Sequence, residues 1–263
     1  MPNILDEIVS NKLKEIEMIK KKNSLELLDK MIKKKNIPLN LAGSLMGDSV
    51  RVIAEIKQNS PSKGLLTNNF DPLELSKIYY ENGAAAISVL TDQKYFKGSL
   101  DHMSVVSGFV NKFSIPVLRK DFILDPYQIY EARAYGADSI LLIVSVLGFK
   151  KLNDLLILAN KLWLQCIVEV HDENELDIAL QAGAEIIGIN NRDLTSFITN
   201  MDTTYRLAKL IPNNKIIISE SGIKTKDDIN KLKEVGVDAV LVGESLITSD
   251  NTAKKLRELT CQK

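Results

Sequence analysis

The chain opens with a segment in which apolar residues recur every three or four positions. The apolar stripe consists of Ile4, Leu5, Ile8, Val9, Leu13, Ile16 and Ile19, with lysine and glutamate between its members. This spacing places apolar side chains along one face of a helix. The first 36 residues are therefore predicted to be helical. The lysine runs 20–22 and 33–35 are assigned to the solvated face, because acidic residues interleave with them.

From residue 52 onward, short β-branched runs alternate with longer amphipathic stretches. The eight apolar runs are 52–57, 85–91, 116–120, 139–144, 167–170, 186–190, 215–221 and 239–243. Runs this short and continuous are typical of parallel strands that are covered on both faces. The stretches between them that fit helices are 71–83, 125–137, 149–163, 172–184 and 224–237. Several of these begin with an N-capping Asp and end on Gly.

Eight alternating strand and helix units predict an α/β fold, a (β/α)8 TIM barrel with an N-terminal helical extension. The whole chain, 1–263, is interpreted as a single barrel domain whose extension covers residues 1–48. A doubly wound open sheet is the alternative. That fold would more naturally carry a GxGxxG fingerprint after its first strand, and the sequence has none there.

Composition narrows the classes of partner. Lys and Arg together number 34, as do Asp and Glu, so the formal net charge is zero and nothing points to nucleic acid or an anionic membrane. The two cysteines, Cys166 and Cys261, have no metal-like or CxxC spacing, which favours a reducing compartment. No apolar window is long enough to span a bilayer, and the N-terminus does not resemble a signal peptide. A cytoplasmic protein is predicted.

Polar side chains gather where the predicted strands end. In the first strand Ile53, Glu55 and Lys57 share one face, and the opposite face is apolar and suits the helices. Glu55 and Lys57 should therefore point into the barrel near its C-terminal mouth, where barrel enzymes place their active sites. Other strands end in Lys120, Glu169, Asn190 and the pair Glu220–Ser221, and parity does not decide which member of that pair faces inward. Charges inside a barrel require partners or a ligand.

The loops after the last two strands have the composition of an anion site. Gly222 and Gly243 each stand at a strand end just before a predicted helix, where backbone N–H groups favour phosphate. Glu244 suits such a site only if its side chain turns away and its N–H binds the anion. Three apolar residues, Phe96, Phe122 and Leu141, fit core or rim packing on their own pattern.

Eight short sequence motifs, taken together, are specific enough to indicate a family. They are EIKQNSPSKG, TDQKYFKGS, LRKDFILD, GADSILLIV, VEVHDENEL, IGINNRDL, ISESGI and VGESL. In this order and spacing they closely resemble the indole-3-glycerol-phosphate synthase family of tryptophan biosynthesis, over about residues 50 to 248. The resemblance implies a carboxy-lyase (a decarboxylase of aromatic amino-acid biosynthesis) that needs neither metal nor cofactor. Its phosphorylated small-molecule substrate, 1-(2-carboxyphenylamino)-1-deoxyribulose 5-phosphate, would close its ring and lose CO₂ and water.

The resemblance also implies roles for individual residues. Lys120 resembles the general acid for ring closure and Glu169 the general base, while Lys57 contacts the anionic substrate. The division of acid steps between the two lysines stays open. Glu55 would orient the lysines, with Asn190 and Glu220 positioning substrate. The remaining implied contacts are Ser60, Arg192 and Ser221 for binding, Gly222, Gly243 and the Glu244 N–H for phosphate, and Phe96, Phe122 and Leu141 for the aromatic ring. The SPSKG loop is interpreted as a mobile flap.

Three alternatives remain open at this point. Phosphoribosylanthranilate isomerase uses a Cys at the end of the first strand, where this chain has Lys57. A Schiff-base aldolase would use Lys57 or Lys120 as nucleophile, and a catalytically inactive barrel would act as a scaffold. A monomer or weak homo-oligomer is expected, with contact to other tryptophan-pathway enzymes left open.

Overall fold

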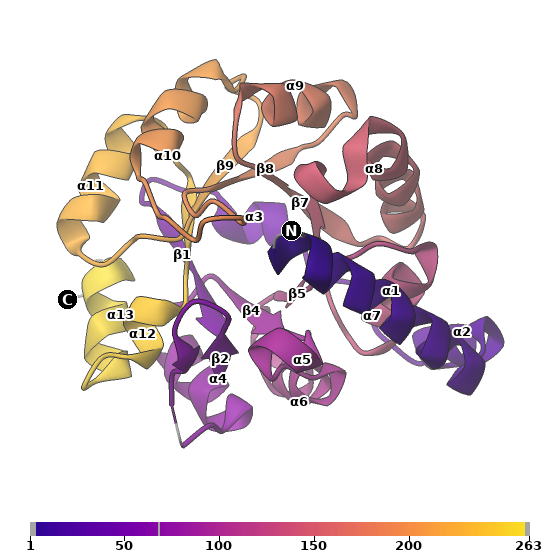
Figure 1. The fold of residues 1–263 in the computed structure, drawn as a ribbon. Coiled ribbons are helices and arrows are strands. Elements are labelled where there is room, and N and C mark those ends of the chain that lie inside the picture. The colour runs from indigo at the N-terminus through magenta and orange to yellow at the C-terminus, as the bar shows by residue number, and fades with distance from the viewer. Residues whose placement is uncertain (1–3, 68, 261–263) are drawn as a thin grey trace.

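The chain forms a closed barrel of eight parallel strands in a computed structural model, which describes residues 4–67 and 69–260. The barrel strands are β1 (Arg51–Ile56), β4 (Ala86–Leu90), β5 (Val117–Lys120), β6 (Ser139–Ile143), β7 (Gln165–Val170), β8 (Ile186–Asn190), β9 (Ile216–Glu220) and β10 (Ala239–Val242). Each pairs with its neighbours in sequence, and β1 pairs with both β4 and β10, which closes the ring (Figure 1). The predicted (β/α)8 barrel is confirmed.

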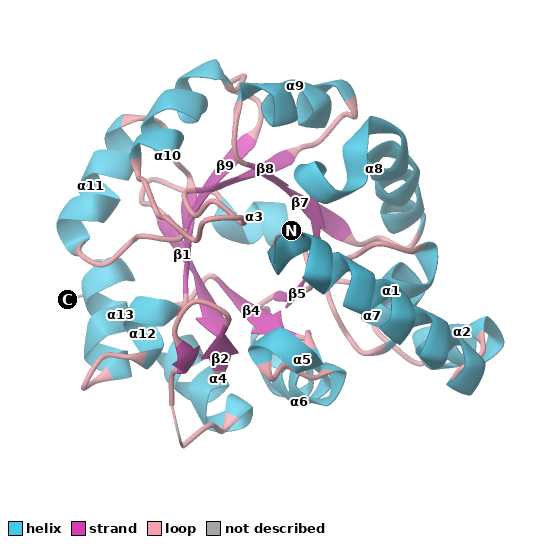
Figure 2. Cartoon of the chain, in the orientation of Figure 1, coloured by secondary structure: helices cyan, strands magenta, loops and turns pink. Residues whose placement is uncertain are grey.

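Helices surround the ring of strands, as Figure 2 shows. They are α4 (Pro72–Glu81), α5 (Gln93–Phe96), α6 (Leu100–Val110), α7 (Pro126–Ala134), α8 (Val144–Lys161), α9 (Glu173–Gln181), α10 (Asp202–Leu207), α11 (Lys226–Glu234), α12 (Glu244–Ile247) and α13 (Thr252–Thr260), with short 3-10 turns at Asn111–Phe113 and Ala208–Leu210. Every stretch predicted as helical between strands overlaps one of these helices. Helices α5, α6, α10 and α13 lie outside the predicted stretches. In α6 the single charged residue, Asp101, leaves the amphipathic pattern weak.

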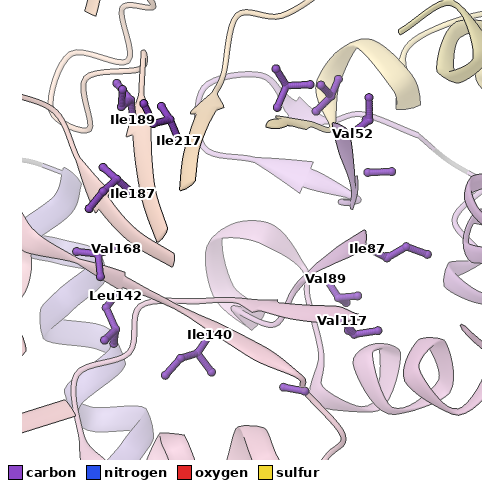
Figure 3. Close-up of a cluster of buried hydrophobic side chains, with 14 of the residues drawn as sticks. Val52, Ile87, Val89, Val117, Ile140, Leu142, Val168, Ile187, Ile189 and Ile217 are labelled. Carbon is purple, nitrogen blue, oxygen red and sulfur yellow. The ribbon is translucent and has the colours of Figure 1, made fainter. Parts of the chain in front are cut away.

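Alternate residues of each strand face either the helices or the barrel interior. Val52, Ala54 and Ile56 of β1 belong to the core between strands and helices, whereas Ile53 belongs to the cluster inside the barrel. Figure 3 shows the outer core, whose labelled residues come from seven of the barrel strands. Apolar side chains from all eight strands fill the interior, so the polar residues at the strand ends stand above a packed floor.

The N-terminal extension consists of three helices instead of one helical region. These are α1 (Ile4–Lys22), α2 (Leu25–Ile32) and α3 (Leu41–Leu45). The break occurs because the Ser24 side chain accepts the N–H of Leu27 and starts a new helix. Helix α2 ends at Ile32, so the prediction of helix as far as residue 36 is wrong at that end. Residues 1–3 of the predicted helical region lie outside the described residues. The division between barrel and extension at residue 48 stays a prediction.

The extension reaches from one end of the barrel to the other. Helix α1 lies beside α5 and α7 at the rim (Figure 1), and α2 packs against α7. At the opposite end, Asp138 just before β6 accepts the N–H of Leu39, and Gln165 at the start of β7 accepts the N–H of Ala42, at 2.8 and 2.9 Å. The extension is therefore fastened to both ends of the strands.

Lys12 fastens α1 to the C-terminal end of the barrel. Its side chain is buried, and its Nζ lies 3.0 Å from carboxylate oxygens of Asp92 after β4 and Asp121 after β5. Burial disfavours the ammonium, but these carboxylates outweigh it and raise the pKa of Lys12. Leu13 belongs to the apolar stripe of the predicted N-terminal helix, so it was expected on the buried face of that helix. The structure leaves Leu13 46% exposed, because the ion pairs turn its neighbour inward.

No helix in residues 4–67 and 69–260 is long and apolar enough to cross a membrane. Cys166 is a free thiol, and Cys261 lies outside the described residues.

Replacing Lys12 by Met is expected to lower the free energy of unfolding by about 3–5 kcal/mol, because it leaves buried carboxylates without their cation. Urea unfolding followed by circular dichroism measures the change. Lys14→Met on the exposed face of the same helix is the matched control and should stay within about 0.5 kcal/mol of the wild type. Equal midpoints for the two variants would contradict the role assigned to Lys12.

Candidate active site

A cavity of about 790 Å³ opens at the C-terminal end of the barrel. Every residue that the sequence put forward as a site residue lines it. They are Glu55, Lys57, Ser60, Phe96, Lys120, Phe122, Leu141, Glu169, Asn190, Arg192, Glu220, Ser221, Gly222, Gly243 and Glu244. Parallel closure of the barrel brings these residues to one place although they span nearly 190 positions of the chain.

Lys120 occupies the centre of the site. It is the last residue of β5, and its Nζ lies 3.3 Å from an oxygen of Glu169 on β7 and 3.0 Å from an oxygen of Glu220 on β9. Burial disfavours its charge, but Glu220, Glu169 and Glu55 outweigh that effect and raise the pKa of Lys120. The side chain is therefore an ammonium at neutral pH.

The two carboxylates beside Lys120 have different proton affinities. Burial disfavours the charge on Glu169, but Lys120 and His171 outweigh it and lower its pKa to about 2. Burial raises the pKa of Glu220 to about 7, against the opposing effect of Lys120 and with the help of the Glu169 charge. The pair titrates as a unit, with Glu169 ionised first.

Glu55 and Lys57 both face the mouth, as strand parity predicted. The Lys57 Nζ lies 2.5 Å from the Glu55 carboxylate, which is buried. Gly243 backs this carboxylate: a Cβ at that position would collide with the Glu55 side chain. Gly243 thus provides space for Glu55 as well as flexibility for the loop.

Glu220, and not Ser221, is the residue of β9 that turns into the barrel. Gly188 on β8 makes room for it, because a Cβ there would collide with the Glu220 carboxylate and with Ile167. Gly188 is also the register partner of Glu169. Sequence reasoning missed Gly188. The only signal was a glycine in the middle of a β-branched strand, which marks close approach of another group.

His171 is a second residue that sequence reasoning missed. It follows β7 with the same parity as Glu169, and its Nε2 lies 3.4 Å from Glu169 Oε1. Its Nδ1 lies 2.9 Å from Glu175 Oε2 on α9. Parity with Glu169, directly after the strand, was the signal that could have found it.

The loops after β9 and β10 form the other end of the cavity. Gly222 has a positive φ of 89° and packs closely against Thr199 and Met201. The Glu244 side chain does not turn away from the mouth, in contrast to the expectation. It pairs with Lys63 at 2.6 Å and Arg192 at 3.2 Å, so two cations balance its charge.

The SPSKG loop forms a small hairpin over the mouth. Strand β2 (Asn59–Ser60) pairs with β3 (Gly64–Leu65), and the Asn59 amide donates to the carbonyl of Tyr95 at 2.6 Å. Arg192 donates to the Ser62 hydroxyl at 2.8 Å, which ties the hairpin to the loop after β8. The mobility of this flap stays a prediction.

One wall of the cavity is apolar. Phe122 and Leu141 are almost fully buried, and Phe96 ends the short helix α5. Leu194 and Phe197, in the loop after β8, also line the cavity and were missed, since an exposed loop gives no periodic signal. A flat aromatic group fits such a wall.

Across the described residues, 4–67 and 69–260, no group of three or more His, Cys, Asp or Glu is arranged to hold a metal ion.

Comparison with known proteins gives consistent results. Residues 5–259 match the family model described as "Indole-3-glycerol phosphate synthase". The indole-3-glycerol phosphate synthase of Dehalococcoides mccartyi is 50% identical over 259 residues, covering 97% of this chain and 99% of the relative. That of Acetivibrio thermocellus is 46% identical over 258 residues, covering 97% and 98%. Thiamine phosphate pyrophosphorylase from Pyrococcus furiosus is similar in fold only, with a TM-score of 0.63, 16% identity and coverage of 84% and 96%.

Gly188→Ala is expected to displace the Glu220 carboxylate and to lower kcat for the reaction at this cavity by about tenfold to 100-fold, because small displacements of groups in a reaction site have effects of this size. Steady-state kinetics measures the loss, and circular dichroism checks that the barrel is intact. Gly108→Ala in α6, where a Cβ meets nothing within 4 Å, is the matched control. An unchanged kcat in Gly188→Ala would show that Glu220 tolerates displacement.

Proposed function

Because the chain belongs to the indole-3-glycerol phosphate synthase family, we propose that Lys120 is the general acid of the family's ring closure and that Glu169 is the general base of the dehydration that follows. The family reaction converts 1-(2-carboxyphenylamino)-1-deoxyribulose 5-phosphate to indole-3-glycerol phosphate, CO₂ and water. The chain is accordingly a carboxy-lyase of tryptophan biosynthesis. The observation that carries the assignment of roles is the Lys120 ammonium held between two buried carboxylates on the cavity floor.

The reaction first requires an acid. The aromatic carbon attacks the ketone of the substrate, and a proton donor must neutralise the charge that develops on the ketone oxygen. Lys120 meets this requirement because its ammonium is charged, lines the cavity and stands above the apolar floor. Ring closure at the carbon that carries the carboxylate interrupts the aromaticity of the ring, and the electron pair released when CO₂ leaves restores it. These steps are redox-neutral, so the proposed sequence uses only acid and base groups.

The same ion pair supplies the base. Lys120 is the strongest of the groups that keep Glu169 ionised against burial. Once Lys120 gives its proton to the substrate, that attraction disappears and Glu169 becomes a stronger proton acceptor. Donation by the acid therefore activates the base that removes a proton during dehydration.

The remaining polar residues position the substrate. Lys57 faces the cavity beside Glu55 and is suited to hold the substrate's anionic groups or to act as acid in dehydration. Asn190 lies at the end of β8 next to Glu220 in register, where its amide can bind substrate hydroxyls. Ser60 lies at the base of the hairpin and Ser221 at the end of β9, and both are proposed binding residues.

The phosphate and the aromatic ring would bind at opposite sides of the cavity. Gly222, Gly243 and Glu244 line the cavity, and their backbone N–H groups would bind the phosphate, with Lys63 and Arg192 adding positive charge there. The aromatic ring would lie against the wall formed by Phe96, Phe122 and Leu141. This arrangement leaves the ketone near Lys120.

One chain supplies every residue of the proposed site, in keeping with a monomer or weak homo-oligomer that acts on a small phosphorylated substrate. The biosynthetic reaction of the family is in keeping with the cytoplasm. The isomerase alternative has no support in the cavity. Cys166 lies at the start of β7, at the other end of the barrel from the cavity, and burial raises the pKa of its thiol.

Purified protein is expected to turn over the carboxyphenylamino deoxyribulose phosphate in the presence of a chelator such as EDTA. Acid–base residues alone complete the proposed steps, so chelation should leave kcat unchanged. The rise of indole fluorescence measures product. Activity that disappears with chelator and returns with added metal would contradict the proposed mechanism.

Lys120→Ala is expected to lower kcat by about 100-fold or more, as removal of a positioned acid does. KM should change less, since other residues hold the phosphate and the ring. Lys150→Ala on the exposed surface of α8 serves as the matched control for loss of one lysine. A Lys120→Ala variant with kcat within threefold of the control would disprove the assignment.

A further inference from the structure

His171 is partly buried beside the proposed general base, and it is not among the described residues that line the cavity. Its side chain is 15% exposed and that of Glu169 is 1% exposed. Glu169 Oε1 and His171 Nε2 face each other at 3.4 Å. Within the described residues neither atom has a hydrogen-bond partner of its own. A polar ring aimed at a buried carboxylate oxygen needs a functional or structural reason.

Glu175 fixes the ring in this orientation. Its Oε2 accepts the backbone N–H of His171 and lies 2.9 Å from Nδ1, so one carboxylate oxygen holds both the main chain and the ring. Glu175 is itself fixed in the first turn of α9, where its N–H is capped by Asp172. Rotation of the ring away from Glu169 would therefore break the contact between Nδ1 and Glu175.

The two oxygens of Glu169 are shared between two cations. Oε2 faces Lys120 and Oε1 faces His171. The charged groups facing the imidazole are Glu169 on its own strand and Glu175 on α9, and beyond Glu169 lie Lys120 on β5 and Glu220 on β9. Burial lowers the pKa of His171, but the two carboxylates that face the ring outweigh burial and raise its pKa to about 10. The ring is thus an imidazolium at neutral pH.

We propose that His171 is a positioning residue that orients Glu169 and keeps it ionised after Lys120 has given up its proton, an inference that rests on the proposed roles of those two residues. Lys120 loses its charge in the catalytic step, whereas His171 keeps its own because it faces no substrate. His171 therefore supplies a positive electrostatic potential at Glu169 that stays constant during the reaction. The part supplied by Lys120 changes during the reaction.

Two variants separate the charge of His171 from its geometry. His171→Ala removes both and is expected to lower kcat about tenfold, with KM within about twofold because the ring does not touch substrate. His171→Gln keeps a donor without the charge and should recover most of kcat at high pH. In both variants the acidic limb of the kcat–pH profile should move up by about one pH unit, because the Glu169–Glu220 pair, which titrates as a unit, binds a proton more easily without the cation.

His102 is the matched control, as the chain has two histidines. It lies on α6, outside the cavity, and packs against Phe70. His102→Gln should therefore leave the pH profile unchanged. Acidic limbs in His171→Ala and His171→Gln that coincide with the wild type would overturn the proposal, since a merely structural role would lower kcat without moving the limb.

A measurement without turnover keeps the two proposals distinguishable. NMR titration of the two rings in the wild type should show His171 protonated at about pH 8. In Glu175→Gln the His171 ring should lose its proton at a lower pH than in the wild type. His102, whose pKa burial lowers, should be neutral there. A His171 ring that titrates at or below its ordinary pKa of about 6.5 would overturn the inference even in an active enzyme. A wild type with no turnover but a charged His171 would count against the proposed function instead.

Discussion

The burial of one ammonium between two carboxylates organises this site. Lys120, Glu169 and Glu220 come from three different strands, and their contacts at 3.0 and 3.3 Å exist only when the barrel is closed. None of the three charges is tolerable alone in so dry a place, since an unpaired buried charge destabilises a fold by several kcal/mol. Because folding brings them together before any substrate arrives, the proposed acid and base are already charged and oriented in the free enzyme.

Space for these charges comes from residues that have no side chain. Gly188 lies under Glu220 and Gly243 lies beside Glu55, and a methyl group at either position would collide with the carboxylate. Both glycines stand in or directly after a strand, where most residues would pack better. The barrel therefore accepts weaker packing at two points of its wall, and polar groups instead of apolar ones fill the resulting space.

Much of this arrangement could be predicted from the sequence, because the strands follow a simple period. Alternation along β1 was sufficient to place Glu55 and Lys57 inside the mouth. Alternation failed at Glu220–Ser221, where two polar residues end a strand and the turn begins at Ser221 with a positive φ of 67°. The helical period likewise failed in α1, where the apolar stripe put Leu13 inside. Ion pairs with residues about 80 and 110 positions later bury Lys12 instead. Hydrophobic period records only contacts with an apolar core, so partners that depend on the tertiary fold remain invisible to it.

Strand β5 shows how those long-range partners serve the site. Lys120 faces the cavity, while Arg119 and Asp121 on either side of it turn to an ion network with α1 and α7. Arg119 contacts Glu131 at 2.9 Å and Asp121 contacts Lys12 at 3.0 Å. The flanking residues are thus fixed by directional charged contacts, which define the position of a backbone more narrowly than apolar packing does. A lysine has four rotatable bonds, and its Nζ can be held between two carboxylates only if its backbone is itself fixed. The helical extension therefore contributes to the position of the acid through the strand that carries it, although it supplies none of the fifteen residues that the sequence placed in the site.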